Sequence, residues 1–365
     1  MTQPVSIVTA SAAYEQWLAT QIPVIKADVK LKHAAMAEDP FSFMRATYYR
    51  WAQLWPVVCQ QWAGGPRLPC VGDLHVENFG TWRDAEGRLV WGVNDFDECG
   101  TLPFANDAVR LATSALLAIR QDHLRLTPRK ACDAIWQGYT KSLKTGGSAF
   151  VLEEEHAWLR KIALGVLRNP TAFWNKLAHW QTITSKTPAA VLKVLRTALP
   201  QGATNLRIVH RQAGLGSLGR PRYTAICDLD GAKIAREAKA IVANGADWRT
   251  AAPAAQPEHM RKMIAHPLRG PDPFNYVNSH WIVRRLSPDC SRVELSQLPD
   301  SRDEEALLYS MGWETANIHL ASSRTRKSLE KAVSKMSSKW LSKAAVAMTE
   351  ATLADWKAWK KQKRG

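Results

Sequence analysis

Two short polar segments of the chain carry side chains that a phosphoryl-transfer reaction uses. Asp73 and Asn78 stand five residues apart in the segment GDLHVEN, and Asp95 and Asp97 follow in the segment NDFDE. Such a reaction needs a carboxylate beside the attacking hydroxyl and hard oxygen ligands for Mg²⁺. The spacing predicts Asp73 as the base and Asn78 and Asp95 as metal ligands, with Asp97 as an additional candidate ligand.

Other interpretations of GDLHVEN remain open at this point. His75 either belongs to the catalytic residues or only orients the loop, and the whole segment could be a structural turn. The triplet Asp73-Leu74-His75 also imitates the DxH motif of metal-dependent phosphoesterases. Such an enzyme should carry GDxxD and GNH segments as well, and the sequence has neither. The second polar segment at a suitable distance favours phosphoryl transfer.

A glycine-rich segment, GLGSLG, lies far downstream and matches the pattern GxGxxG through Gly214, Gly216 and Gly219. Dinucleotide-binding folds and kinases share this pattern, so the residues that follow it decide between them. A dinucleotide fold opens a helix directly after the glycines, whereas here Arg220-Pro221 and a β-prone run follow. We therefore expect a hairpin that covers phosphates, with Ser217 among its contacts, rather than a plain structural turn.

These motifs resemble those of known kinases. GDLHVEN looks like the GDLHxxN loop of aminoglycoside phosphotransferase and choline kinase-type enzymes, NDFDE looks like their IDWD or IDFD metal motif, and Asp107 resembles the buried aspartate that follows. Val71 stands where those enzymes commonly have a histidine. The runs PFSFMRA, GDLHVENFG, NDFDE, GLGSLG and MGWETANIH together resemble the bacterial family catalogued as domain of unknown function 2252, over most of the chain. The resemblance implies a protein-kinase-like fold and leaves the substrate open.

A kinase-like sheet also needs a lysine for the nucleotide phosphates. The run AKIAREAKA offers Lys233, Arg236 and Lys239. Lys239 fits the lysine strand that the resemblance implies, whereas Lys233 lies beside a turn and Arg236 should point to the opposite face of a regular strand. Glu258 is the available carboxylate partner for Lys239. The alternative is that both picks reflect only an ion pair at the protein surface, which would give the same sequence pattern.

The order of the motifs predicts an α+β, two-lobed, protein-kinase-like fold that is circularly permuted, because the glycine segment follows the catalytic segments. We expect a mainly helical lobe in residues 1–200, a β-rich nucleotide-binding lobe with a small antiparallel sheet in 201–300, and helices returning to the first lobe, with a basic tail, in 301–365.

His319 resembles the histidine that ends the helix before the catalytic loop, and a core role for it is the alternative. Either 41–58 or 303–321 could be the helix behind that loop.

Local patterns predict the individual elements. Residues 11–62 indicate two helices, and helical patterns continue from Asp107, an expected helix cap, to about residue 199. A short hairpin around residues 88–93 should join the two polar segments. Four core-facing aromatic residues are expected at positions Phe43, Tyr48, Trp51 and Trp55. Five strands are expected at 206–211, 221–229, 232–242, 280–286 and 291–298, with an Asp230-Gly231 turn before the third and the last two paired across Pro288-Asp289.

Charge is concentrated at the end of the chain. The net charge is +16, and residues 324–365 hold twelve Lys or Arg and three acidic residues, a net charge of +9. Lys331, Lys335, Lys339 and Lys343 recur every four residues, which indicates a solvated stripe on one helix. Attraction of this tail to nucleic acid, an acidic substrate or a membrane surface is the less favoured alternative.

Composition and cysteine content indicate a cytoplasmic globular protein. Hydrophobic residues make up 46% and charged residues 22%, and no run is apolar enough to span a membrane. The six cysteines form no CxxC pair, so we expect reduced and mostly buried thiols. The N-terminus lacks the pattern of a secretory signal.

The sequence thus predicts a phosphotransferase that uses ATP and Mg²⁺. In this hypothesis the GLGSLG amides lie over the phosphates and Lys239 neutralises their charge. The acceptor is an unidentified hydroxyl compound, and the basic composition mildly favours an anionic small molecule. Nucleotidyl transfer on the same fold is one alternative. A non-catalytic kinase-like module that binds nucleic acid through the basic tail is another.

Overall fold

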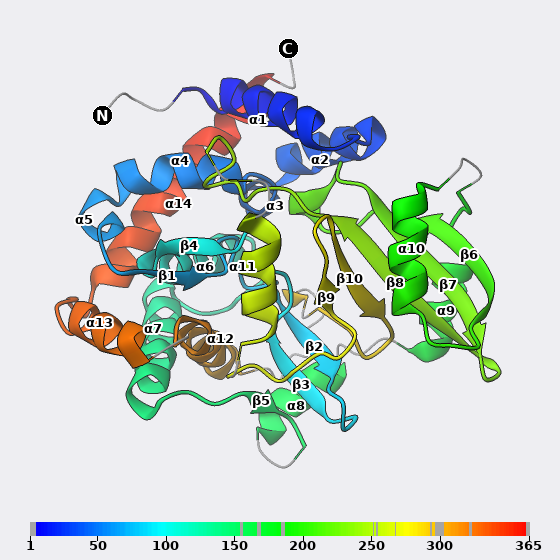
Figure 1. Cartoon of the computed structure of the whole chain (residues 1–365). Helices are drawn as coiled ribbons and strands as arrows, with labels where there is room; N and C mark the ends of the chain where they lie inside the picture. The colour runs from blue at the N-terminus through cyan, green and yellow to red at the C-terminus, as the bar shows by residue number, and fades with distance from the viewer. Residues whose placement is uncertain are drawn as a thin grey trace.

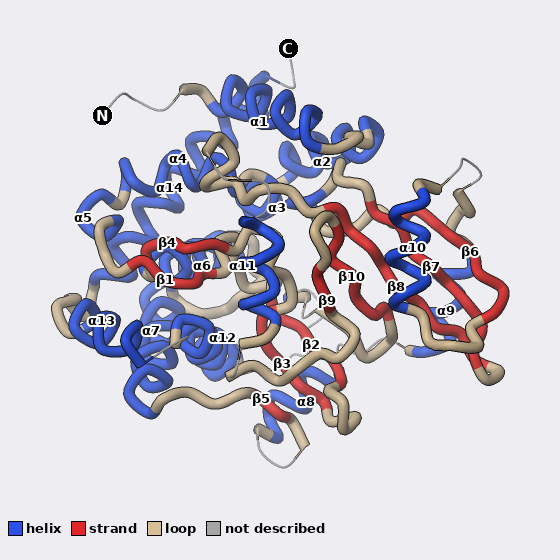
Figure 2. Tube along the Cα trace, in the orientation of Figure 1, coloured by secondary structure: helices blue, strands red, loops and turns tan. Residues whose placement is uncertain are grey.

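The structure is a computed structural model that describes residues 5–153, 156–165, 169–183, 187–250, 252, 255–266, 268–292, 294–295, 303–320 and 323–362. It is an α+β protein in which helices predominate and the strands form small antiparallel sheets. Figure 2 shows most of the strands gathered on one side of the molecule and most of the helices on the other. In the described part of the chain, no helix is both long enough and apolar enough to cross a membrane.

The helical side is built around the largest hydrophobic core. Its central helices are α6 (Ala105–Arg120), α7 (Pro128–Thr145), α12 (Glu304–His319) and α14 (Trp340–Gln362). Local sequence sets the ends of α7, because Thr127 caps its first turn, Pro128 occupies N1 and Gly146 adopts a left-handed conformation at its C-terminus. Gly138 of α7 and Gly312 of α12 let these two helices approach so closely that a Cβ on either glycine would lie less than 2 Å from a backbone oxygen of the other helix.

The N-terminal region contains five helices where the sequence predicted two. They are α1 (Ile7–Gln21), α2 (Lys26–Glu38), α3 (Pro40–Ala46), α4 (Tyr48–Val58) and α5 (Gln60–Ala63). The chain breaks between α2 and α3 because Asp39 is extended and accepts a hydrogen bond from the Ser42 amide, with Pro40 at the first helical position. The four expected core aromatics of this region are buried as predicted.

Five antiparallel strands form the main sheet, in the order β6-β7-β8-β10-β9. Their bounds are β6 (Thr204–His210), β7 (Arg222–Leu229), β8 (Ala232–Ala240), β9 (Tyr276–Val277) and β10 (Trp281–Leu286). Asp230 and Gly231 both have positive φ, of 49° and 79°, so the predicted turn between β7 and β8 is confirmed. Helix α11 (Ala255–Ile264) lies between β8 and β9 in the chain.

Two further helices belong with this sheet. α9 (Pro170–Ala178) packs on one face and α10 (Ala189–Ala198) on the other, so the region that accompanies the sheet begins near residue 169 rather than at 201 (Figure 1). The expected pairing of β10 with residues 291–298 is wrong, because β10 lies between β8 and β9, and Arg292 instead forms a bridge to Gly80. Residues 293 and 296–298 of that predicted strand lie outside the described residues.

Two smaller sheets position the polar segments. β1 (Arg67–Cys70) pairs with β4 (Gly100–Pro103), and β2 (Phe79–Arg83) pairs with β3 (Leu89–Val93), which also pairs with β5 (Phe150–Val151) next to α8 (Ala157–Gly165). The GDLHVEN segment thus runs from β1 to β2, and the NDFDE segment runs from β3 to β4. The predicted hairpin between the two segments is confirmed as β2 and β3.

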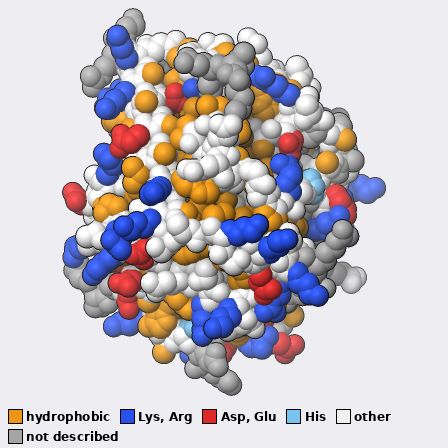
Figure 3. Space-filling view, turned by 90° about the vertical axis from the view of Figure 1, so that its left-hand side faces the viewer, with side chains coloured by type: hydrophobic (Ala, Val, Ile, Leu, Met, Phe, Trp, Pro, Cys, Tyr) orange, Lys and Arg blue, Asp and Glu red, His pale blue; other side chains and the backbone are white. Residues whose placement is uncertain are grey.

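The C-terminal region is integrated into the helical side. α13 (Ser323–Val333) ends before Lys335 and Lys339, and α14 begins at Trp340, so the expected single lysine stripe is interrupted by a turn. α14 buries Trp340 and Trp359 and packs along α6. Figure 3 shows Lys and Arg side chains spread over the face beside α5 and α13, with acidic and apolar side chains between them. Helix α1 contacts α14 at the top of Figure 1, so the first and the last helix lie side by side.

Candidate active site

A cleft of about 1010 Å³ lies between the small sheets and the five-stranded sheet. We call residues 72–78 and 94–98 the acidic wall and residues 211–220 the glycine loop. The cleft is lined by most of the residues that the sequence singled out, namely Asp73, His75, Asn78, Asp95, Asp97, Gly214, Gly216 and Ser217. Chain segments more than a hundred residues apart are therefore brought to one place.

Asp73 is held by a buried arginine and faces the glycine loop. Arg110 of α6, which is fully buried, donates from Nε to Asp73 Oδ1 at 2.9 Å and from Nη2 to the same oxygen. Burial raises the pKa of Asp73 and the Arg110 guanidinium opposes this, with the pKa above its ordinary value. A Cβ on Gly216 would lie 3.4 Å from Asp73 Oδ2 and 3.0 Å from the Arg45 carbonyl oxygen. Gly216 therefore brings the loop backbone close to the carboxylate that would serve as base.

Asn78 joins the two halves of the acidic wall. Its Nδ2 donates to the carbonyl oxygens of Asp73 and Asp95, both at 3.1 Å, and its Oδ1 accepts the Asp95 amide at 3.0 Å. Because an amide oxygen has two lone pairs, Oδ1 keeps one that the Asp95 amide does not use. The structure therefore gives Asn78 a positioning role and leaves an oxygen for a metal.

Asp95 and Asp97 converge on the ammonium group of Lys239. The Lys239 Nζ lies 3.3 Å from Asp95 Oδ2 and 2.5 Å from Asp97 Oδ2. Burial pushes the pKa of Asp95 upward, but Lys239 and then Arg284 more than offset it, so the pKa is lowered. Burial and the neighbouring Asp95 charge raise the pKa of Asp97. Both carboxylates thus point to one position already taken by a cation.

The three basic candidates on β8 are separated as strand alternation predicts. Arg236 turns to the opposite face, where it donates to the Ala198 carbonyl of α10, and Lys233 pairs with Asp228 at the exposed end of the hairpin. Only Lys239 of these three reaches the acidic wall. Glu258 does not meet Lys239, because its half-exposed side chain pairs with neighbours on its own helix, Arg261 and Lys262. The predicted Lys239–Glu258 pair is therefore wrong, since α11 directs this carboxylate to solvent.

The glycine loop connects β6 to β7 and contains one 3₁₀ turn, Leu215–Ser217. Helix α2 holds it from behind, because Lys32 Nζ donates to the Gly216 carbonyl at 3.1 Å and the Ile25 amide donates to the Gly219 carbonyl at 2.9 Å. Burial lowers the pKa of Lys32 to about 8. Gly219 has φ of 97° and a Cβ there would lie 2.7 Å from Val29, so this glycine serves packing against α2 and does not line the cleft.

One ion pair links the two walls. The Arg220 guanidinium lies 2.6 Å from Glu98 Oε1 and 3.8 Å from Asp97 Oδ2, and Glu98 Oε2 accepts the Gly245 amide at 2.6 Å. Arg220 and Glu98 are both buried. The end of the glycine loop is therefore fixed relative to the second half of the acidic wall.

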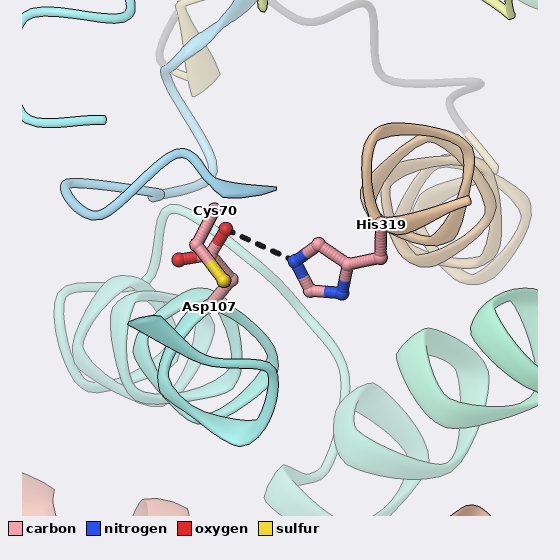
Figure 4. Close-up of side chains that lie close together, drawn as sticks. All are labelled: Cys70, Asp107 and His319. Carbon is pink, nitrogen blue, oxygen red and sulfur yellow. Dashed lines mark hydrogen bonds and ion pairs between the residues drawn. The ribbon is translucent and has the colours of Figure 1, made fainter. Parts of the chain in front are cut away.

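Asp107 supports the acidic wall from below rather than capping its own helix. α6 begins at Ala105, and the Asp107 carboxylate accepts the amides of Val71 at 2.6 Å and Gly72 at 3.0 Å. His319, at the end of α12, lies 3.3 Å from the same carboxylate (Figure 4). The predicted cap is thus wrong, because the backbone amides of Val71 and Gly72 take both carboxylate oxygens.

The cluster of Cys70, Asp107 and His319 in Figure 4 has the residue types of a metal site. However, His319 also bonds the Tyr139 hydroxyl at 2.8 Å, and Cys70 donates to the Leu102 carbonyl at 3.5 Å. Burial raises the pKa of Cys70 well above its ordinary value, which disfavours the thiolate that a metal requires. The cluster is therefore a structural support, and His319 has the core role that the sequence left open.

Both regions that the sequence offered as the helix behind GDLHVEN contribute to the surroundings of that segment. α3 supplies Phe41, whose ring makes a T-shaped contact with His75, and Arg45, which pairs with Glu77 at 2.6 Å, whereas α12 supplies His319. His75 Nδ1 accepts the Glu77 amide at 3.2 Å, and burial lowers its pKa well below the ordinary value. His75 is therefore a neutral group that orients the loop and also borders the cleft.

Sequence reasoning missed a group of arginines beside Lys239. Arg211, Arg222 and Arg284 all bind the carboxylate of Glu237 on β8. Alternation on β8 places Glu237 on the same face as Lys239, and this signal could have been used. The arginines come from three separate strands or loops, so no spacing in the sequence connects them.

The molecule is thus an α+β protein in which a cleft lined by carboxylates is faced by a glycine loop. The model of a family described as an uncharacterized protein conserved in bacteria, DUF2252, matches residues 24–172, so this segment is similar to that family. The matched segment starts just before α2 and includes the whole acidic wall, whereas the glycine loop and α12 lie outside it. A comparison with curated proteins found no match, and neither did a comparison with solved structures.

Proposed function

We propose that this protein is a kinase-like phosphotransferase that transfers the γ-phosphoryl group of ATP to a hydroxyl acceptor. The observation that carries the proposal is the meeting of Asp73, Asp95 and the glycine loop in one cleft, with Gly216 next to the Asp73 carboxylate. Phosphoryl transfer depends mainly on positioning and on neutralising charge, and these groups are of the kinds it uses.

The donor set fits Mg²⁺. Asp95 and Asp97 already converge on the ammonium group of Lys239, and Asn78 adds a hard oxygen beside them. Bound there, Mg²⁺ would neutralise charge on the β- and γ-phosphate oxygens. Lys239 would release the two carboxylates to the metal and turn its ammonium group to the phosphates.

The remaining residues would act on the acceptor. Asp73 would accept or steer the proton of the acceptor hydroxyl, and its raised pKa makes it a better base than an exposed aspartate. Arg110 would hold the carboxylate in place through Oδ1 and leave Oδ2 toward the cleft. The sheet supports the same proposal, because Lys239 lies on the third strand of the five-stranded sheet and the glycine loop joins its first two, as in protein kinases.

The substitution Asp73→Asn tests this function. It keeps the shape of the side chain and an acceptor for Arg110, so the variant should fold and bind Mg²⁺-ATP with nearly unchanged affinity. The release of ADP by the wild type, measured in single-turnover reactions with and without candidate hydroxyl acceptors, should fall by a factor of about 100 or more in the variant. Equal loss of nucleotide binding and turnover would contradict the assignment of Asp73 as the base.

A further inference from the structure

One buried carboxylate beside the cleft organises three arginines. Glu237 is completely buried, and its Oε1 lies 2.6 Å from Arg222 and 3.1 Å from Arg284, while its Oε2 lies 2.9 Å from Arg211. Three guanidinium groups and one carboxylate leave the cluster with a net charge of +2. Arg211 and Arg284 keep 16% and 23% of their side-chain surface exposed, so an anion in the cleft can reach both guanidinium groups.

The cluster lies on the face of the sheet that borders the cleft. In the sheet register Arg284 is opposite Glu237 and Arg222 is opposite Lys239, so these residues occupy neighbouring positions. Arg211 and Arg284 line the cleft, and Arg284 also lines a small adjoining pocket with Asp95 and Lys239. The excess positive charge therefore lies directly beside the proposed metal site.

Arg222 connects the cluster to the glycine loop. Its Nη2 donates to the Ser217 hydroxyl at 3.0 Å, and a Cβ on Gly214 would lie 3.1 Å from the same nitrogen. The absence of a side chain at Gly214 leaves room for this arginine beneath the loop. A ligand held against the loop backbone would thus meet the cluster on its other side.

We propose that Arg211 and Arg284, oriented by Glu237, form a subsite that binds the polyphosphate chain of the nucleotide. This inference rests on the proposed function, and it assigns most of the phosphate recognition to arginines rather than to Lys239. Guanidinium forks match the geometry of phosphate oxygens, and Glu237 orients both forks before the ligand arrives. In the described residues Arg211 donates to protein only through Nη1, so further donors remain for a ligand.

The subsite predicts selectivity for the number of phosphates. A nucleoside triphosphate should bind much more tightly than the corresponding monophosphate, because each added phosphate brings further charge and oxygen acceptors for the two arginines. Inorganic tripolyphosphate, which has no base or sugar, should bind as well. Since the arginines carry their charge without a metal, this binding should persist in the presence of a chelator.

The experiment compares tripolyphosphate binding to the wild type and to Arg211→Gln and Arg284→Gln, by titration calorimetry with EDTA present. Lys233→Gln is the matched control, because it removes a positive charge from the exposed end of β8, the strand that carries Glu237. We expect each cluster variant to bind at least tenfold more weakly, because it loses a charge-assisted hydrogen bond to the phosphates. The control should bind like the wild type. Arg211→Lys should restore part of the affinity and shows that the position tolerates substitution.

Two results would overturn the subsite: no binding of tripolyphosphate to the wild type, or equal binding to the wild type and both cluster variants. A parallel titration with Mg²⁺-ATP separates this inference from the proposed function. If the wild type and both variants bind Mg²⁺-ATP equally, the subsite is wrong and the function stands. If the wild type binds tripolyphosphate but not Mg²⁺-ATP, the anion subsite stands and the proposed function fails.

Discussion

The acidic wall and the glycine loop face each other across the cleft, yet different parts of the molecule hold them in place. The acidic wall is fixed by buried groups of the helical side, such as Arg110 and Asp107. The glycine loop is fixed largely by α2, through Lys32 and Ile25, and by the Arg220–Glu98 pair. The difference indicates that the acidic wall is anchored in the largest hydrophobic core, whereas the glycine loop depends on a few contacts that can be removed separately.

Replacement of Asp107 should have the largest effect. Asp107→Ala leaves the buried amides of Val71 and Gly72 and the ring of His319 without their acceptor, so we expect a loss of about 4 kcal/mol in the free energy of unfolding. Urea unfolding measures it. Asp107→Asn keeps one acceptor oxygen and should lose less. A loss below about 1 kcal/mol for the alanine variant would contradict the proposed support of the acidic wall.

Glu314, which lies close to the acidic wall, should make the free energy of unfolding depend on pH. This residue of α12 lies behind β3 with its carboxylate at 3.5 Å from the Val93 amide, and burial raises its pKa to about 7. Since the folded pKa lies above the unfolded value near 4.5, its contribution to stability is present in acid and is lost as the pH rises toward 7. Between about pH 5 and 8 the wild type should lose about 2.5 kcal/mol that Glu314→Gln does not lose.

Urea unfolding at both pH values measures this difference, with the exposed Glu305 of the same helix as control. Glu305→Gln should keep the pH dependence of the wild type. If Glu314→Gln shows the same decline as the wild type, Glu314 is not the group responsible.

Removal of Lys32 should act on the other wall alone. Lys32→Met takes away the hydrogen bond to the Gly216 carbonyl, which is worth about 1 kcal/mol, so amide hydrogen exchange should accelerate in residues 214–217. Exchange in residues 71–78 should stay unchanged, and Mg²⁺-ATP affinity should fall about fivefold. Lys30→Met, at an exposed position of the same helix, is the control. Equal acceleration in both walls would mean that they are not held separately.

The sequence predicted the parts of this site that are local. GDLHVEN and NDFDE were recognisable because their residues are close in the chain, and strand alternation correctly placed Arg236 on the face opposite to Lys239. Contacts between distant segments had no such signal. Asp107 was expected to cap its helix because nothing in the sequence shows that the Val71 and Gly72 amides would reach it, and Glu258 was assigned to Lys239 only because it was the available carboxylate on the next helix.

The lysine-rich C-terminus shows the same limit. Spacing of four residues predicted one solvated helix, but spacing cannot reveal that the chain turns between α13 and α14 to bury Trp340 in the helical core. The role of α2 was equally hidden, because it contacts the glycine loop through residues far apart in the chain. Lys32 and Gly216, for example, are separated by 184 positions.

The most direct test of the proposed function is the thermal midpoint of the purified protein with and without millimolar Mg²⁺-ATP, compared with the variant Asp95→Ala. A ligand that binds only the folded state must raise its stability, and we expect a rise of about 2–5 °C in the wild type that is absent in Asp95→Ala. Glu258→Gln, which removes an exposed carboxylate outside the cleft, should rise like the wild type. No rise in the wild type, or an equal rise in Asp95→Ala, would contradict a metal–nucleotide site in this cleft.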